Sequence, residues 1–456
     1  MKILTSLTFF GGLEEVGGNK ILLEDGEVKL FLDFGKNFGK EKKYYREPFL
    51  KPKNEKHLLN LDLLPEIKGL YHDDNFPPID GVIVSHPHLD HWGYVCFLDT
   101  RIPIYCGECT KKMILNYEFC SYSGTSSEYY LANFRKKSGR EVYRDFNTFR
   151  TGDILDMENL KIEPVHVDHS IPAAYGFIIH TTSGKVAYTG DFRMHGPKSN
   201  MTRDFLDKAS DYDIDYLIIE GTNITGAEIS SESHVEQITD KLIKHTDGLV
   251  VISFSDRDVD RLNSIYRATK RNNRKLALST KQAFLLRDLY KDPNIKVPDL
   301  RRDDIFVFGK EKSWLRAWEE EIHNEFNVLY GSDINSIQDR IVLAASYYDM
   351  NELMDVNPQA GSIFILSKSE PFDEAGEIQH EKLLNWCNHY GMPQYHVHAS
   401  GHAMPHELKS VIKEISPNTM IPVHTERPLL FEKYVADLDV NFKSPILKEK
   451  ISLSRK

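Results

Sequence analysis

The sequence has few cysteines and no long apolar run. Its 456 residues include five cysteines, too few and too scattered for a disulfide framework. Cys106 and Cys109 form a lone C-x-x-C pair, which we interpret as structural because no second cysteine pair completes a zinc tetrahedron. No segment approaches the roughly 18 apolar residues of a membrane span, and the N-terminal stretch lacks the apolar core and cleavage site of a signal peptide. We therefore expect a soluble cytoplasmic protein with no membrane contact.

The chain also lacks an excess of basic residues. Its net charge of −11 excludes a surface coated in positive charge but leaves room for a local basic channel. Residues 36–53 contain seven Lys or Arg with aromatic side chains between them, a composition that suits single-stranded nucleic acid. Residues 256–275 predict a basic helix, in which we expect Arg257 and Arg261 to face a cleft. The alternative for both segments is an ordinary solvated loop and a solvated helix face.

The order of apolar runs predicts an α/β protein with one module inserted into another. Short alternating runs open the chain and indicate paired strands. From about residue 225 to 368, strand-like and helix-like segments alternate, which predicts a mostly parallel sheet with covering helices. Strands that end in histidine then return. We therefore divide the chain into residues 1–222, an inserted module at 223–370, and residues 371–456, and we expect residues 107–150 to be mostly helical.

One short stretch concentrates residues that bind metal ions. "SHPHLDHWGY" follows a buried strand and contains His86, His88, Asp90 and His91. Alternate residues of an extended segment point the same way, so His86 and His88 could share one ion while Asp90 and His91 turn toward a second. Imidazole nitrogen and carboxylate oxygen suit Zn²⁺, and Mn²⁺ is the alternative if carboxylate and water dominate. The competing interpretation is a surface histidine cluster.

A site for two metal ions needs further ligands from elsewhere in the chain. His169 follows a strand in "VHVDHSIP", and Asp191 ends another in "YTGDFR". One carboxylate between two ions can bridge them about 3.5–4 Å apart. His166 is a rival to His169. Later in the chain, "HVHASGHAMPHEL" and "IPVHTE" offer more histidines, of which we interpret His396 and His406 as surface residues.

These residues carry a resemblance to the metallo-β-lactamase superfamily, and within it to the β-CASP nucleases of the ribonuclease J group. The family's motifs occur in order along the whole chain, beginning with "GGLEEVGGNK". They then run through Asp33 in "FLDFG", "HPHLDH", "HSIP", "TGDF", Glu220 in "IIEGT", His402 in "SGHA" and His424 in "PVHTE". The resemblance implies an αββα sandwich with an inserted β-CASP domain.

The resemblance also implies a role for each matching residue. His86, His88 and His169 would hold one metal ion, Asp90, His91 and His424 the other, and Asp191 would bridge them. Asp90, Asp191, Glu220 and His402 form the implied catalytic group, in which Glu220 supports His402 beside the scissile phosphate. The implied substrate-binding residues are His398, Ser400 and Gly401.

The implied activity is hydrolysis of single-stranded RNA by two divalent metal ions. Histidine at position 424 is typical of the RNA-type members of the family. We expect a 5′-to-3′ exonuclease, with endonuclease activity as a further expectation, that acts in RNA decay or maturation. The alternatives are a DNA-processing β-CASP nuclease, a non-catalytic RNA-binding subunit of a nuclease complex, and a small-molecule hydrolase on the same scaffold. A homodimer or a larger nuclease complex is compatible with the resemblance.

The chain departs from the family pattern at several positions. Ala173 stands where an aspartate usually follows "HSIP", and Trp92 replaces a usual aliphatic residue. Residues 117–150 are richer in Tyr and Ser than is common, which bears on the shape of a substrate channel. Few residues follow His424, so we expect a short form that lacks the separate C-terminal domain of many relatives.

Overall fold

The computed structural model describes residues 5–45, 50–71, 77–121, 128–137, 140–228, 230–369 and 374–454. The chain forms two compact units. Unit 1 is built from Met1–Met194, Lys198–Ala227 and Gly401–Lys456, and unit 2 from His195–Pro197 and Glu228–Ser400. Unit 2 is thus inserted into unit 1 along the chain. The insertion ends later than the expected residue 370, because strand β21 (Gln394–His396) pairs with strand β20 (Ile363–Leu366) of the same sheet.

Within the described residues, unit 1 contains two seven-stranded sheets. The first has the order β24 (Lys450–Ser452), β1 (Ser6–Gly11), β2 (Lys20–Asp25), β3 (Val28–Phe34), β4 (Gly81–Val84), β5 (Ile104–Gly107) and β9 (Phe146–Phe149). The second has the order β10 (Leu155–Met157), β11 (Leu160–Val167), β12 (Ala174–Thr181), β13 (Gly184–Tyr188), β14 (Tyr216–Glu220), β22 (Thr419–Val423) and β23 (Asn441–Phe442). In each sheet the pairing changes from antiparallel to parallel partway across.

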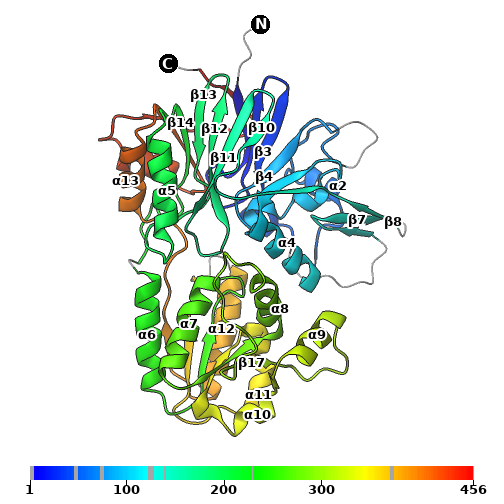
Figure 1. Cartoon of the computed structure of the whole chain (residues 1–456), viewed down its shortest axis with the longest axis vertical. Helices are drawn as coiled ribbons and strands as arrows, with labels where there is room; N and C mark the ends of the chain where they lie inside the picture. Colours follow the sequence, from blue (N-terminus) through cyan, green and yellow to red (C-terminus); the bar gives the residue numbers. More distant parts are fainter. Residues whose placement is uncertain are drawn as a thin grey trace. The chain divides into compact units, whose positions relative to one another are not determined.

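Helices cover the outer faces of these sheets. The helices of unit 1 are α1 (Phe38–Glu41), α2 (Glu55–Asn60), α3 (Leu89–Trp92), α4 (Glu108–Ser121), α5 (Ser199–Ser210), α13 (Pro405–Ile415) and α14 (Pro428–Tyr434). Figure 1 shows α5 and α13 on one side of the strands and α2 and α4 on the other. One apolar cluster joins β2–β5 to the helices on their side, and another joins β11–β14 and β22 to α5, α13 and α14. These layers confirm the expected αββα sandwich.

The segment from 107 to 150 differs from the expectation of mostly helical structure. Only its first part is helical, since α4 ends at Ser121. It is followed by β6 (Glu128–Tyr130), β7 (Phe134–Lys137) and β8 (Arg140–Tyr143), which form a small antiparallel sheet of their own, and then by β9. Aromatic and β-branched residues such as those of "EYY" and "REVY" favour strands. Tyr129, Tyr130 and Tyr143 of this segment lie in these strands, whereas Tyr117 and Ser121 belong to α4.

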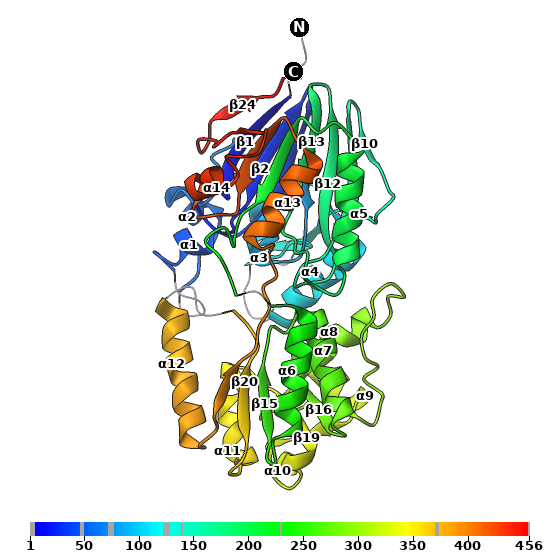
Figure 2. The same cartoon turned by 90° about the vertical axis from the view of Figure 1, so that its left-hand side faces the viewer.

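Unit 2 is a parallel α/β module. Its described residues form one sheet in the order β18 (Val328–Leu329), β17 (Ile305–Phe308), β16 (Lys275–Ser279), β19 (Ile341–Ala344), β15 (Val250–Ser253), β20 and β21. All of its strand pairs are parallel. The helices are α6 (Glu232–Lys244), α7 (Val259–Arg271), α8 (Thr280–Leu289), α9 (Ala317–Glu325), α10 (Gly331–Asn335), α11 (Leu353–Val356) and α12 (Glu374–His389). Figure 2 shows α12 on one side of the sheet and α6 and α7 on the other.

The strands of unit 2 follow from their sequences. "VVIS", "IVLA" and "IFIL" are short apolar runs that are buried along their full length. Strands with both faces covered by helices need such continuous apolar runs. No helix among the described residues combines the length and the apolar character that crossing a bilayer requires.

Candidate metal centre

The candidate metal centre lies in unit 1, where β4 ends. Its buried strand "GVIV" passes directly into Ser85 and His86, and the short helix α3 then begins with His88 at its N-cap. The side chains of His86 and His91 are fully buried, and those of His88 and Asp90 are half-buried. Buried imidazoles need polar partners, and donor atoms from other parts of unit 1 surround these rings.

The first donor group contains three histidines and one aspartate. Nδ1 of His88 lies 3.0 Å from Nε2 of His86 and 3.1 Å from Nε2 of His169. Oδ2 of Asp191 lies 3.5 Å from Nε2 of His86. Ligand atoms about 2.0–2.1 Å from a tetrahedral zinc ion would lie about 3.4 Å from one another. The spacing of this group is close to that arrangement.

The second donor group contains two aspartates and two histidines. Oδ2 of Asp90 lies 3.1 Å from Nε2 of His424 and 3.8 Å from Nε2 of His91. Oδ2 of Asp191 lies 3.1 Å from Nε2 of His91 and 3.5 Å from Nε2 of His424. In each of the two groups, all four ligand atoms lie within 4.8 Å of one another. Asp191 belongs to both groups, so one carboxylate joins them.

The donor set fits divalent metal ions by a second criterion. Two buried atoms at the junction of the groups, Nε2 of His91 and Oδ1 of Asp191, have no hydrogen-bond partner within the described part of the chain. Buried polar atoms almost always have a partner. Imidazole nitrogen together with carboxylate oxygen is a donor set that zinc prefers. The centre therefore fits divalent metal ions.

A second set of residues orients the imidazole rings. Nδ1 of His91 lies 2.7 Å from Asp33, whose carboxylate also accepts hydrogen bonds from the Ser85 backbone, the Ser85 hydroxyl and the Tyr188 hydroxyl. Nδ1 of His424 lies 2.8 Å from the Thr222 hydroxyl. Partners on one ring nitrogen fix the ring and leave the other nitrogen directed at the metal. Asp33 thus has the structural role that the sequence motif predicts.

The rings of His86 and His169 are oriented in the same way. Nδ1 of His86 lies 3.0 Å from the Ser85 hydroxyl, and Nδ1 of His169 donates to the backbone carbonyl of Gly401. For His86, His91, His169 and His424, the nitrogen left free to face the donor groups is therefore Nε2. His88 is the exception, because its Nδ1 faces them.

The electrostatics of the centre follow from its burial. Burial lowers the pKa of His86 and of His169 well below the ordinary range, so both rings are neutral and able to bind a metal ion. Burial alone would raise the pKa of Asp191, but His424 and His91 outweigh it and hold that carboxyl well below its usual range. For His91, the carboxylates of Asp191 and Asp33 outweigh burial and raise the pKa well above its ordinary value.

Glu220 and His402 form a pair beside the donor groups. Glu220 ends β14 and is fully buried, and its Oε2 lies 3.1 Å from Nδ1 of His402. Burial alone would lower the pKa of His402, but Glu220 outweighs it and raises the pKa to about 9. His402 therefore carries a proton at neutral pH in the metal-free protein. The same carboxylate accepts from the backbone of Phe192 and Ala403, which fixes its position.

Two glycines allow the backbone to approach Asp90 closely. A Cβ atom at Gly17 would lie 2.6 Å from Oδ2 of Asp90, and one at Gly35 would lie 1.6 Å from its backbone oxygen. Gly17 also has a positive φ of 79°, a conformation that favours glycine. The "GGLEEVGGNK" opening thus brings its backbone against the metal loop, which gives this motif a physical reason.

Several other histidines lie away from the donor groups. His166 lies on β11 and stacks on Tyr175 with ring centroids 4.8 Å apart. His396 is exposed on β21, where its Nε2 donates to the carbonyl of Lys368, and His406 is exposed on α13. Ala173 is buried with a positive φ of 62°, and its methyl group offers no polar atom to the centre.

The predicted substrate-binding residues have mixed positions. His398 and Ser400 are half-buried in unit 2, and the carbonyl of Ser400 accepts from Nε2 of His195. Gly401 contributes its carbonyl to His169, and its proposed contact with phosphate stays a prediction. Arg257 is half-buried.

The expectation that Arg261 faces a cleft is wrong. Arg261 is fully buried, and its guanidinium contacts both carboxylate oxygens of Glu232 and donates to the backbone carbonyls of Ser367 and Ala399. A basic residue on an amphipathic helix normally reaches solvent, but here a buried acid from the neighbouring helix α6 holds it. In the basic segment 36–53, Lys36 pairs with Glu41 at 2.8 Å and Lys40 with Glu15 at 3.1 Å. Residues 46–49 of that segment lie outside the described residues.

Sequence reasoning missed the residues that hold the ligands in place. Thr222, Ser85 and Tyr188 contribute hydroxyl groups to His424, His86 and Asp33. Each stands within three residues of a predicted ligand or acid, so proximity in the sequence was the available signal. Hydroxyl residues are common in loops, however, and only the fold shows which of them point inward.

Two family profiles match the chain. One, described as a beta-lactamase superfamily domain, matches residues 62–249. The other, described as a Zn-dependent metallo-hydrolase RNA specificity domain, matches residues 394–441. Between them they include all seven predicted metal ligands.

Curated relatives and a solved structure agree with these matches. The chain is 25% identical to ribonuclease J of Mycoplasma pneumoniae, over 94% of this chain and 69% of that protein. It is 24% identical to ribonuclease J of Helicobacter pylori, over 93% of this chain and 56% of the relative. The chain thus spans about half to two thirds of these relatives' lengths. A crystal structure of an Enterococcus faecalis protein of unknown function covers 99% of this chain at 24% identity with a TM-score of 0.77, and it supports the fold.

Proposed function

Because the chain is a ribonuclease J-like member of the metallo-β-lactamase superfamily, we propose that it is a metal-dependent ribonuclease that uses two divalent metal ions. Zn²⁺ is the proposed native metal and Mn²⁺ the alternative. We further propose that it degrades single-stranded RNA from the 5′ end, with internal cleavage as a secondary activity. Its proposed role is RNA decay or maturation, alone or within a nuclease complex.

The observation that carries this proposal is the shared carboxylate. The two four-residue groups of predicted ligands meet at Asp191, and each brings its ligand atoms within 4.8 Å of one another. Asp191 also belongs to a third such group, with Glu220, His402 and His424. Metal ions bound there would activate a water molecule and neutralise charge on a phosphate group. A single-metal hydrolase would need only one such group.

The protein's own residues supply the rest of the chemistry. Hydrolysis of a phosphodiester leaves an oxygen that must take up a proton as it departs. His402 carries a proton and is held by Glu220 at 3.1 Å next to Asp191. We assign His402 as the group that protonates the departing oxygen, and Glu220 as the residue that keeps His402 protonated.

The C-terminal segment favours RNA over DNA. The profile described as an RNA specificity domain spans His398, Ser400, His402 and His424. In this proposal His398, Ser400 and Gly401 bind phosphate, and Arg257 contacts the strand. The DNA-processing alternative is kept as an outcome of the experiment.

The experiment uses a 5′-labelled, 5′-monophosphorylated single-stranded RNA and a DNA of the same sequence. The purified full chain is incubated with each in the presence of Zn²⁺ or Mn²⁺, beside Asp90→Ala/His91→Ala and the matched surface control Asp207→Ala. We expect labelled mononucleotide from RNA with the wild type and the control, and none with the double variant. Internal fragments would move the assignment to an endonuclease, and degradation of DNA would overturn the RNA assignment.

A further inference from the structure

The hydroxyl group of Thr222 contacts both the proposed proton donor and a predicted metal ligand. Thr222 follows β14, two residues after Glu220. Its Oγ1 lies 2.8 Å from Nδ1 of His424 and 3.2 Å from Nδ1 of His402. The two rings are stacked, with centroids 5.4 Å apart and an angle of 29° between their planes. Both rings therefore direct the same nitrogen at one oxygen atom.

The contacts of this hydroxyl with His424 select one tautomer of the ring. A threonine hydroxyl has one proton to donate and two lone pairs that accept. Oγ1 donates to the backbone carbonyl of His424 at 3.2 Å. The contact with the ring can then be a hydrogen bond only if Nδ1 donates its proton to Oγ1. Nε2 keeps the lone pair that a metal ion needs, and Nε2 is the nitrogen that faces Asp90 and Asp191.

The second lone pair of the hydroxyl faces His402. Nδ1 of His402 lies almost as close to the Thr222 hydroxyl, at 3.2 Å, as to the carboxylate oxygens of Glu220, at 3.1 and 3.2 Å. The backbone N–H of Thr222 also donates to Oε2 of Glu220 at 3.2 Å. Thr222 thus contacts both members of the Glu220–His402 pair as well as the metal ligand His424.

The backbone of His424 depends on such contacts. Its φ is +53°, in the left-handed region that residues other than glycine rarely adopt. The residue is 1% exposed, and its N–H donates to the carbonyl of Gly12 at 2.8 Å. Residues in rare backbone conformations persist where several surrounding contacts fix them, and they occur often at functional sites. Thr222 supplies two of these contacts, one to the carbonyl and one to the ring.

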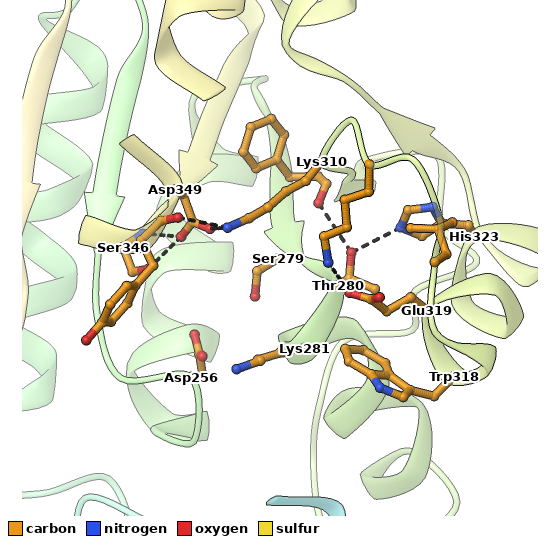
Figure 3. A pocket seen from close by; sticks show the side chains of 14 residues that line it. Asp256, Ser279, Thr280, Lys281, Lys310, Trp318, Glu319, His323, Ser346 and Asp349 are labelled. Atoms are coloured by element: carbon orange, nitrogen blue, oxygen red, sulfur yellow. Dashed lines mark hydrogen bonds and ion pairs between the residues drawn. The ribbon is translucent and has the colours of Figure 1, made fainter. Parts of the chain in front are cut away.

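A threonine of unit 2 has similar partners but no link to the metal centre. Thr280 lines a pocket of about 220 Å³ where β16, β17 and β19 end. Its Oγ1 lies 3.1 Å from Nε2 of His323 and 3.4 Å from the carbonyl of Phe308 (Figure 3). Among the described residues, no group of candidate metal ligands includes His323. Thr280 therefore provides a matched control for the loss of a hydroxyl beside a histidine.

We propose that Thr222 is a positioning residue that links the second metal position to the proton donor. Its hydroxyl keeps Nε2 of His424 free for the metal ion and, together with Glu220, holds the ring of His402. This role rests on the proposed function and adds a residue to it. Without the hydroxyl, the proton of His424 can move to Nε2, where it blocks the metal ion, and His402 loses one of its two acceptors.

The test compares three variants of the full chain with the wild type. Thr222→Val keeps the shape of the side chain and removes the hydroxyl, Thr222→Ser keeps the hydroxyl, and Thr280→Val removes the comparable hydroxyl of unit 2. Each protein is freed of metal with EDTA, dialysed and titrated with Zn²⁺ by calorimetry, which gives the number of ions bound and their affinities. Thermal unfolding of the metal-free proteins checks that all of them fold.

We expect Thr222→Val to bind one of its two ions about 10–100-fold more weakly, as loss of a hydrogen bond to a ligand histidine does. Thr222→Ser should restore most of this affinity, and Thr280→Val should bind both ions like the wild type. Wild-type affinity for both ions in Thr222→Val would overturn the proposal, and so would a Thr222→Ser variant that binds zinc as weakly as Thr222→Val.

A second measurement tests the link to His402. RNA hydrolysis is followed at Zn²⁺ concentrations that saturate both positions in every variant. We expect kcat of Thr222→Val to stay about tenfold or more below that of the wild type with little change in KM, because His402 still lacks its second acceptor. Full kcat under these conditions would overturn the link. If the wild type does not cleave RNA, the proposed function fails, whereas the zinc affinities still decide whether Thr222 positions His424.

Discussion

The metal centre of unit 1 and the interior of unit 2 neutralise buried negative charge in opposite ways. At the metal centre of unit 1, Asp90 and Asp191 form their described ion pairs only with histidines. In unit 2, Glu232 has the guanidinium of Arg261 at 2.7 Å, Asp349 has the ammonium group of Lys310, and Glu319 has that of Lys312. Histidine neutralises an acid only when it is protonated. The comparison shows that unit 2 completes its own charge pairs, whereas the centre of unit 1 is built to receive cations.

The largest effect is expected from removal of the shared carboxylate. Asp191→Ala takes a ligand from both donor groups at once, so the repulsion between the two bound cations is no longer screened. We expect RNA hydrolysis to fall by about 10³-fold or more and the metal content, measured by elemental analysis, to fall with it. Asp207→Ala, on the exposed face of α5, is the matched control. Full metal content together with full activity in Asp191→Ala would show that the groups do not share this ligand.

The next largest effect is a loss of stability in unit 2. It should largely disappear when both residues of the buried ion pair between Arg261 and Glu232 are replaced. Arg261→Met leaves the carboxylate of Glu232 buried without its cation, which typically costs about 3–5 kcal/mol. Arg261→Met/Glu232→Leu removes both charges, and the cost should then be much smaller. Hydrogen exchange of the backbone amides of β15 and β20 measures the stability of unit 2 directly.

The pair of variants also sharpens the contrast with unit 1. A pair that only stabilises the fold can be replaced by apolar side chains, whereas a pair that binds a ligand cannot. If the double variant were as unstable as the single one, the hydrogen bonds from Arg261 to the carbonyls of Ser367 and Ala399 would be the important contacts.

The sequence predicted the side chains that converge at the candidate metal centre better than the residues around them. His86, His88, Asp90 and His91 are close in the chain, and His169 and Asp191 follow strands, so these six could be grouped from their positions. His424 was added to them by the family resemblance. Thr222 and Tyr188 could not be assigned in this way, because their role depends on which side of a strand end faces inward. The parallel sheet of unit 2 followed from the apolar runs, whereas the αββα layers of unit 1 were implied by the family resemblance.

Arg261 shows why charge alone was misleading. Its position in a helix rich in charged residues is typical of a surface side chain. The sequence gives no sign that Glu232 of α6 would form an ion pair with it. The pocket of unit 2 was missed for a similar reason. Its residues come from the ends of strands far apart in the chain, and only the strand order brings Thr280 beside the residues that follow β19.

The smallest expected effect is a change in the pH dependence of stability when Glu220 is replaced. In the metal-free protein, Glu220 raises the pKa of His402 to about 9. A histidine whose pKa is raised on folding stabilises the fold below its ordinary pKa near 6.5, and this contribution is lost as the pH rises toward 9. Glu220→Gln removes the carboxylate, so the metal-free variant should lose this decline in stability between those pH values. The Arg261–Glu232 pair of unit 2 should not titrate over this range, because guanidinium remains charged.

The enzyme with its metal ions bound should show the effect of Glu220 in the pH dependence of its rate of RNA hydrolysis. Bound cations repel protonated His402, so about 9 is the upper limit for its pKa there. Because the protonated ring is the active form, the rate of RNA hydrolysis should fall as the pH rises through that pKa. In Glu220→Gln this fall begins at lower pH, and the rate at pH 8 drops by about 10²-fold, the usual contribution of a general acid. His406→Gln, an exposed histidine on α13, is the control. A profile that moves equally in both variants, or in neither, would show that Glu220 does not set the protonation of His402.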